Sequence, residues 1–182
     1  MATIFISGSM RIENIHADVR SKLDEIINSQ VDIIVGDADG VDASFQMFLN
    51  TRQYRNVTIY CSGLDVRNNI GRWPVRSIST DKRCNSRLFY VAKDLEMASK
   101  CDFGLMVWDS RSTGTLSNVI ELLKQKKRST VFVDKLQKFL EITDVASFEE
   151  LILSMNKDDL ERADKKIQLR KKIDELKQLN FL

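Results

Sequence analysis

The sequence predicts an α/β fold: a doubly wound, mostly parallel sheet of about five strands with a helical C-terminal extension. Three observations support this. Short apolar runs alternate with segments whose apolar residues recur at helical spacing, the runs end in loops of small polar residues, and the alternation stops near residue 135. Such alternation indicates βαβ units with right-handed crossovers. We therefore expect one α/β domain over residues 1–135 and a helical extension over residues 136–182.

The predicted strands are apolar runs of strand length, each bounded by turn residues. They cover residues 3–7, 31–35, 57–61, 103–108 and 129–133. The predicted helices carry apolar side chains three or four residues apart. They cover residues 13–29, 41–52, 86–100 and 115–127.

The C-terminal extension has a different composition. Ser147-x-x-Glu150 is a capping-box pattern that opens a helix. Asn156 can cap a second, highly charged helix over about 157–179, whose apolar residues drift around the helix axis. This helix is too short and irregular for a confident coiled coil. Two interpretations stay open: the extension packs along the domain, or it is an arm for homo-oligomer formation.

Composition excludes several classes of protein. The chain has 182 residues, of which 43% are apolar and 30% charged, as in globular proteins. A formal net charge of +2 provides no strong field toward nucleic acid or membrane, and no apolar run approaches the length of about 18 residues that a membrane span needs. We expect no membrane partner.

The N-terminal residues lack the pattern of a signal peptide, and the three cysteines have no CxxC spacing. These features favour a reducing cytoplasm. The chain has a single histidine, His16, which disfavours Ser-His or Cys-His catalysis. No cofactor and no metal is expected.

Four of the five strand runs end in a loop built from Gly, Ser, Thr or Asp, a composition that turns also favour. Four such loops follow the strands that end near residues 7, 35, 61 and 108. In open parallel sheets, ligands bind outside the carboxyl ends of the strands, where the strand order switches. These loops are therefore the candidate walls of a ligand site.

The loop Ser110-Arg-Ser112-Thr113-Gly114-Thr115 connects a strand to a helix N-terminus. The free amides and dipole of a first helical turn favour an anion. The hydroxyls suit a phosphate or ribose, and Gly114 allows close approach. Helix capping alone also explains Ser and Thr here.

The loop Gly36-Asp37-Ala38-Asp39-Gly40-Val41-Asp42 contains three carboxylates. Carboxylates repel phosphate but suit sugar hydroxyls, a cationic base edge or a divalent metal. The D-x-D spacing alone is a poor metal signature. A plain turn, with Asp39 capping the following helix, is the alternative.

The segment from residue 64 to about 84 has no clear period and contains the only proline, Pro74. Such long connections are usually functional or mobile. Six basic residues from Arg67 to Arg87, both included, favour a lid over phosphates. Trp73 either stacks on a base or anchors the loop to the core. A solvated loop is the alternative.

Together, these loops resemble the SLOG superfamily, and in particular its small YspA-like proteins. Ser7-Gly8-Ser9 matches the first turn of that pattern, with Met10 in place of an arginine, and residues 36–42 match the Gly-rich second loop. Ala92 to Met97 match a third segment, with Lys93 for arginine, and residues 112–115 match a fourth. The resemblance covers about residues 2–134. It implies a Rossmann-like fold that binds nucleotides or molecules derived from them.

Some relatives in that superfamily cleave N-glycosidic bonds, namely the phosphoribohydrolases and the nucleoside deoxyribosyltransferases. The resemblance would place their glutamate three residues after Gly-Thr, but this sequence has Asn118 there. An amide cannot replace a carboxylate nucleophile equally well. Asp94 or Glu96, or Asp37 and Asp39, could substitute for it, and of these Asp94 and Asp39 are the speculative choice. Whether the protein is an enzyme is therefore left open.

Binding or sensing of a nucleotide-like small molecule is the preferred hypothesis, and N-glycosidic hydrolysis or transfer is the alternative. Single-stranded nucleic acid, which the related DNA-processing protein A binds, is disfavoured by the low net charge and the acidic loop. The expected ligand residues come from the strand exits and the helix starts. They are Gly8, Ser9, Gly36, Asp37, Ala38, Asp39, Gly40, Asp42, Ser110, Ser112, Thr113, Gly114, Thr115 and Asn118.

Overall fold

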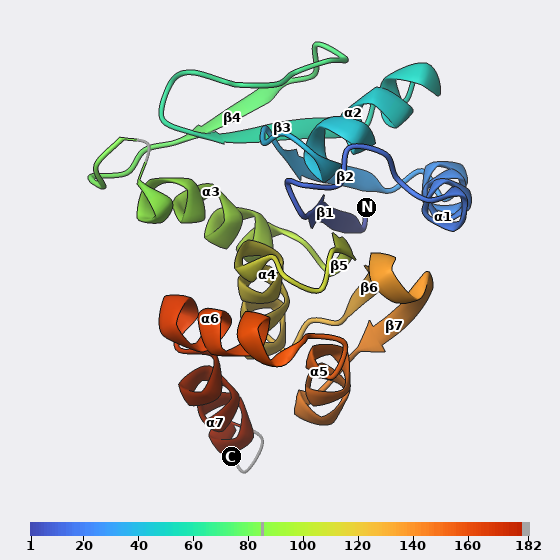
Figure 1. Ribbon diagram of the computed structural model, residues 1–182. Coiled ribbons are helices and arrows are strands. Elements are labelled where there is room, and N and C mark those ends of the chain that lie inside the picture. The colour runs from blue at the N-terminus through green and yellow to red at the C-terminus, as the bar shows by residue number, and fades with distance from the viewer. Residues whose placement is uncertain (85, 180–182) are drawn as a thin grey trace.

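A computed structural model describes residues 1–84 and 86–179 and has a seven-stranded sheet at its centre (Figure 1). The strand order is β4-β3-β2-β1-β5-β6-β7, and only β7 is antiparallel to its neighbour. The strands are β1 (Thr3–Gly8), β2 (Asp32–Gly36), β3 (Val57–Ser62), β4 (Val75–Ile78), β5 (Phe103–Trp108), β6 (Ser129–Val133) and β7 (Lys138–Ile142). This confirms the predicted Rossmann-like α/β fold.

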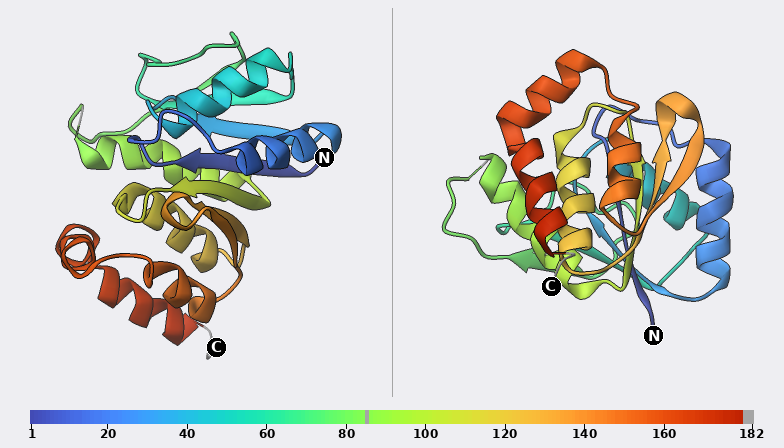
Figure 2. Two further views of the ribbon diagram at one scale, coloured as in Figure 1. Left: turned by 45° about the vertical axis from the view of Figure 1, so that its right-hand side comes forward. Right: turned by 90° about the horizontal axis from the view of Figure 1, so that it is seen from below.

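Helices cover both faces of the sheet (Figures 1 and 2). They are α1 (Ala17–Asn28), α2 (Val41–Thr51), α3 (Arg87–Lys100), α4 (Thr113–Lys124), α5 (Val145–Ile152), α6 (Lys157–Ile167) and α7 (Leu169–Leu179). Successive side chains of a strand point to opposite faces. Accordingly, Ile4 and Ile6 of β1 join the core under α1 and α2, whereas Phe5 joins the core under α3 and α4.

The strand order switches between β1 and β5. From β1 the chain winds outward through β2, β3 and β4, then returns by α3 to β5 on the other side of β1. The connections leave the carboxyl ends of β1 and β5 in opposite directions, which opens a crevice there. The switch point therefore fixes where a ligand site is expected.

The sequence prediction of about five strands missed two edge strands. β4 lies within the segment assigned as a loop, and its residues Val75, Arg76 and Ser77 are exposed, so they show no apolar pattern. β7 follows a turn in which Gln137 has a left-handed φ of 49°. Because that turn contains no Gly, Asn or Pro, the sequence did not indicate a turn there, and the strand after it was not predicted.

The helix expected over about 157–179 is two helices. Gln168 between them has a φ of 54° and ends α6. Ile167 and Leu169 are both buried, although residues two apart cannot share one face of a continuous helix. The break explains the drift of apolar residues in the sequence. The helix before them begins earlier than predicted, because its capping box is formed by Asp144 and Ser147.

The C-terminal helices α6 and α7 pack on α4 (Figure 2). Ala163, Ile167, Leu169, Ile173 and Leu176 are buried in the same core cluster as the inner face of α4. Within the described residues, none of the helices is long and apolar enough to cross a membrane. The extension thus contributes to the core on the side where α3 and α4 lie.

Candidate functional site

A cavity of about 520 Å³ lies at the carboxyl ends of β1 and β5, at the switch in strand order. Ligand pockets usually span about 300–1,000 Å³. Its walls come from the end of β1, the loop after β2, the α3 face, the start of α4 and the outer face of α6. We call it the switch-point cavity.

Many of the residues expected from the sequence line this cavity, including one of the two speculative catalytic residues. They are Gly8, Ala38, Asp42, Asp94, Ser112, Thr113, Gly114, Thr115 and Asn118. These residues lie in four segments that are far apart in the sequence, and the fold brings them together. Their role in binding stays a prediction.

Six other expected residues are not part of the lining: Ser9, Gly36, Asp37, Asp39, Gly40 and Ser110. Most of them hold the walls in place. The buried Ser9 accepts a hydrogen bond from the Asp109 amide at 3.1 Å, and the hydroxyl of Ser110 lies 3.0 Å from that of Ser154. Gly40, with a φ of 73°, packs against the backbone of Met10, where a side chain would clash.

Asp37 forms a buried ion pair that holds the β3–β4 connection. Its carboxylate accepts hydrogen bonds from the Arg67 side chain at 2.6 and 3.1 Å and from the Arg67 amide at 3.1 Å. Burial alone would raise the pKa of Asp37, but these hydrogen bonds outweigh it and lower the pKa. The Arg67 guanidinium also lies 4.4 Å from the centre of the Tyr90 ring, and both residues line the cavity. Asp37 thus positions part of the cavity wall through Arg67.

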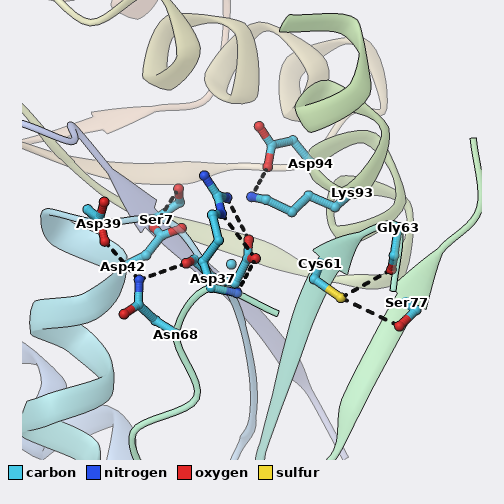
Figure 3. A network of polar contacts seen from close by, with 12 residues as sticks. Ser7, Asp37, Asp39, Asp42, Cys61, Gly63, Asn68, Ser77, Lys93 and Asp94 are labelled. Carbon is cyan, nitrogen blue, oxygen red and sulfur yellow. Dashed lines mark hydrogen bonds and ion pairs between the residues drawn. The ribbon is translucent and has the colours of Figure 1, made fainter. Parts of the chain in front are cut away.

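Asp39 makes a more exposed contact with the same connection. Asn68 donates to the Asp39 carboxylate and to the Asp37 carbonyl, both at 2.9 Å (Figure 3). Within the described part of the chain, no group of three metal-binding side chains is present. The first two carboxylates of the Gly-rich loop therefore bind neighbouring protein groups.

Asp42 is the carboxylate of this loop that reaches the cavity. It is buried, it accepts a hydrogen bond from Ser7 Oγ at 3.1 Å, and burial raises its pKa to about 6 (Figure 3). A Cβ at Gly36 would clash with Asp42 Oδ2 and lie 2.6 Å from Lys93 Nζ. The carboxylate and the ammonium therefore meet over Gly36, where a side chain would displace one of them.

Lys93 completes a buried charge cluster with Asp42 and Asp94. Its Nζ lies 2.8 Å from Asp94 Oδ1 (Figure 3). Burial would lower the pKa of Lys93, but the neighbouring Asp94 and Asp42 carboxylates raise it overall. The cluster combines two carboxyl groups and one ammonium on the cavity wall, which is a donor and acceptor set for sugar hydroxyls.

The N-terminus of α4 has free hydrogen-bond donors. Asp109 accepts from the amides of Arg111 at 2.9 Å and Ser112 at 2.7 Å, and Ser112 Oγ caps the amide of Thr115 at 3.5 Å. Within the described residues, no group accepts from the amides of Thr113 and Gly114. Both residues line the cavity. Free amides at a helix N-terminus are the usual donors to a phosphate.

Cations surround this end of the cavity. Arg111 and Arg162 share one buried carboxylate, that of Asp159, at 3.3 and 2.5 Å. Arg87 Nη1 donates to the carbonyl of Lys166 at 2.6 Å, which ties α3 to α6. All of these basic side chains line the cavity. Arg162 and Lys166 were not predicted from the sequence, because nothing local to α6 shows which of its faces docks beside α4.

The segment between Arg67 and Arg87 is only partly a cavity wall. Both of these arginines line the cavity. Trp73, in contrast, is buried in the core under α1 and α2, and its Nε1 donates to the Tyr54 carbonyl at 2.8 Å. The structure therefore shows that Trp73 anchors the segment to the core.

Comparison with known proteins gives one informative result. A solved structure of DNA processing protein A from Helicobacter pylori, described for its single-stranded DNA binding mode, matches with a TM-score of 0.56. The identity is 15%, and the match covers 92% of this chain and 80% of that one. No family model matches the sequence, and no curated protein matches it. The chain therefore has a fold similar to that of DNA processing protein A.

Proposed function

We propose that the protein binds a nucleotide or nucleotide-derived small molecule in the switch-point cavity, with a phosphate at the N-terminus of α4. The free amides of Thr113 and Gly114, at the rim of a cavity of about 520 Å³, carry this proposal. The Ser112 hydroxyl accepts from the amide and the hydroxyl of Thr115, and its own proton adds a donor at the same end. A phosphate there would be stabilised by the helix dipole and by Arg111.

The opposite wall suits a sugar and a base. Asp42 and Asp94 offer hydrogen-bond acceptors to hydroxyls, and Tyr90 and Val91 add apolar surface nearby. The order of the four loop motifs supports a SLOG-like protein, because the matching segments converge on this cavity. The free cysteines Cys61, Cys84 and Cys101 fit a reducing compartment such as the cytoplasm.

We infer that the C-terminal extension belongs to the binding unit and is not a self-association arm. Its apolar residues Ile167, Ile173 and Leu176 are used in packing near α4. Its polar residues Arg162 and Lys166 line the cavity. The apolar side chains of the extension are thus used in the core of the same chain, and the polar ones line its cavity.

The proposal is tested by thermal shift of the purified protein with nucleosides, nucleotides, cyclic nucleotides and ADP-ribose derivatives. A ligand present at about 100 times its dissociation constant adds about 2.7 kcal/mol of stability. We expect at least one phosphorylated member to raise the melting temperature, with its parent nucleoside raising it less. If no member of the panel shifts the melting temperature, the proposal is wrong.

A second candidate function is cleavage of an N-glycosidic bond. Two carboxyl groups on the cavity wall favour it: Asp94, and Asp42 with a pKa of about 6, close to the pH at which a general acid works. Asp39, the other carboxylate considered from the sequence, is hydrogen-bonded to Asn68. Release of free base from a bound nucleotide, lost in Asp42→Asn or Asp94→Asn, would support cleavage, and an intact ligand would support binding alone.

Single-stranded nucleic acid is the third candidate, because the protein of similar fold is described as binding single-stranded DNA. Such binding usually combines a basic groove with exposed aromatic platforms. Among the described residues of this chain, no aromatic side chain is fully exposed, and Tyr90 is covered by Arg67. Fluorescence anisotropy with labelled oligonucleotides separates this candidate from mononucleotide binding.

A further inference from the structure

The switch-point cavity has more positive charge than one phosphate at α4 requires. Arg87, Arg111, Arg162 and Lys166 all line it, and we call these four residues the cationic rim. Asp159 is the carboxylate that pairs with members of the rim, and Arg111 and Arg162 share it. Within the described residues, no carboxylate pairs with Arg87 or Lys166. Glu121 and Asp109 also line the cavity, and with Asp159 they make three carboxylates against the four cations, so the rim keeps an excess of positive charge.

The rim is continuous with the proposed phosphate site. Arg111 lies in the loop that leads into α4, and Asp159 connects it to Arg162 on α6. Arg87 at the start of α3 is fixed to the last turn of α6 by its hydrogen bond to the Lys166 carbonyl. The cations therefore extend from the α4 N-terminus along α6 toward α3.

The surroundings of Arg87 are electropositive as well. Burial lowers the pKa of Lys172 on α7, and the positive charges of Lys124 and Arg87 lower it further, although Glu175 and Glu121 act in the opposite direction. Cations that face one another without enough carboxylates are costly in a folded protein. A bound anion would relieve that repulsion.

Building on the proposed function, we propose that Arg87, Arg162 and Lys166 form a second phosphate subsite, so that the ligand is a nucleoside 5′-diphosphate or a similar molecule with two phosphoryl groups. The first phosphoryl group binds the amides of Thr113 and Gly114. The second extends outward to the guanidinium groups, which hold phosphate oxygens in paired hydrogen bonds, and to the Lys166 ammonium. The C-terminal extension thus determines how many phosphates the site accepts.

Two adjacent lysines provide a matched test. Lys165 and Lys166 are both exposed in the last turn of α6, but Lys166 lines the cavity and Lys165 does not. Isothermal titration would measure the affinity of the wild type, Lys166→Glu and Lys165→Glu for the 5′-monophosphates and 5′-diphosphates of adenosine, guanosine, cytidine and uridine. Circular dichroism would check that each variant is folded.

For the base that binds best, we expect the wild type to bind the diphosphate about tenfold more tightly than the monophosphate. Lys166→Glu should remove most of that difference and change the affinity for the monophosphate by less than about threefold, whereas Lys165→Glu should leave both affinities within about twofold. Equal affinities for the two ligands, or equal effects of the two substitutions, would overturn the second subsite while the proposed function stands. Absence of any binding of these eight nucleotides by the wild type would overturn the second subsite, and the proposed function would fall with it if the wider thermal-shift panel also gave no shift.

Discussion

The two loops richest in polar residues, 36–42 and 109–115, use their polar groups differently. In the first, the Asp37 and Asp39 carboxylates are occupied by Arg67 and Asn68 of the β3–β4 connection. In the second, the amides of Thr113 and Gly114 have no acceptor within the described residues. Groups that are already paired hold the wall together, whereas unpaired donors at a cavity are free to bind a ligand. We therefore expect a ligand to contact the helix start more closely than the Asp37 and Asp39 side chains.

The largest expected effect concerns the stability of the first loop. Asp37→Ala leaves the Arg67 guanidinium without its carboxylate in a partly buried position, so we expect a loss of about 2–3 kcal/mol in the free energy of unfolding. Urea denaturation measures it. Asp24→Ala, which breaks the exposed ion pair with Arg52, is the control and should cost much less. Equal losses would mean that Asp37 is not a structural anchor.

A second prediction concerns Asp42, the third carboxylate of the same loop, and the pH dependence of stability. The folded state raises the pKa of Asp42 to about 6, so between about pH 4 and pH 6 the folded protein holds a proton that the unfolded chain has released. The stability of the wild type relative to Asp42→Asn should therefore fall by about 2–3 kcal/mol as the pH rises from about 4 to 7. The contribution of Asp37 is common to both proteins and cancels. Parallel stability curves for the two proteins over this range would contradict the raised pKa.

The third prediction separates binding from folding at the second loop. A Cβ at Gly114 meets no atom closer than Ser112 Oγ at 3.9 Å, so Gly114→Asp fits. An acidic residue in the first helical turn should leave the melting temperature unchanged or slightly raised. It should also weaken nucleotide binding by about tenfold or more, because it repels the phosphate. The neutral variant Gly114→Asn is the control, and an equal loss of affinity in both would exclude the charge effect.

The smallest expected effect is that of Asp39→Ala. Its hydrogen bond with Asn68 is exposed, so its loss should cost about 0.5 kcal/mol and leave the cavity intact. Nucleotide affinity should stay within about twofold of the wild type, a difference near 0.4 kcal/mol. A large loss of affinity with unchanged stability would show that Asp39 contacts the ligand.

The sequence predicted the parts of the fold that depend on local pattern. The inner strands and α1 to α4 have clear periodicity, and Ser112 caps α4 through a contact three residues away. β4 was missed because Val75, an exposed edge residue, has no apolar pattern around it. The same limit applies to the site. Thr113 and Gly114 are recognisable from the helix start, whereas the Asp37–Arg67 pair spans 30 residues and the Arg111–Asp159 contact spans 48. Only tertiary packing reveals those partners.

The most direct test of the account is amide chemical-shift mapping by NMR during titration with the nucleotide that gives the largest thermal shift. We predict that the largest changes fall on the backbone amides of Thr113 and Gly114, with small changes at Asp37 and Asp39, because their carboxylates are already bound to protein groups. If the largest changes fall on Asp37 and Asp39, and the amides of Thr113 and Gly114 do not respond, the assignment of the two loops is wrong.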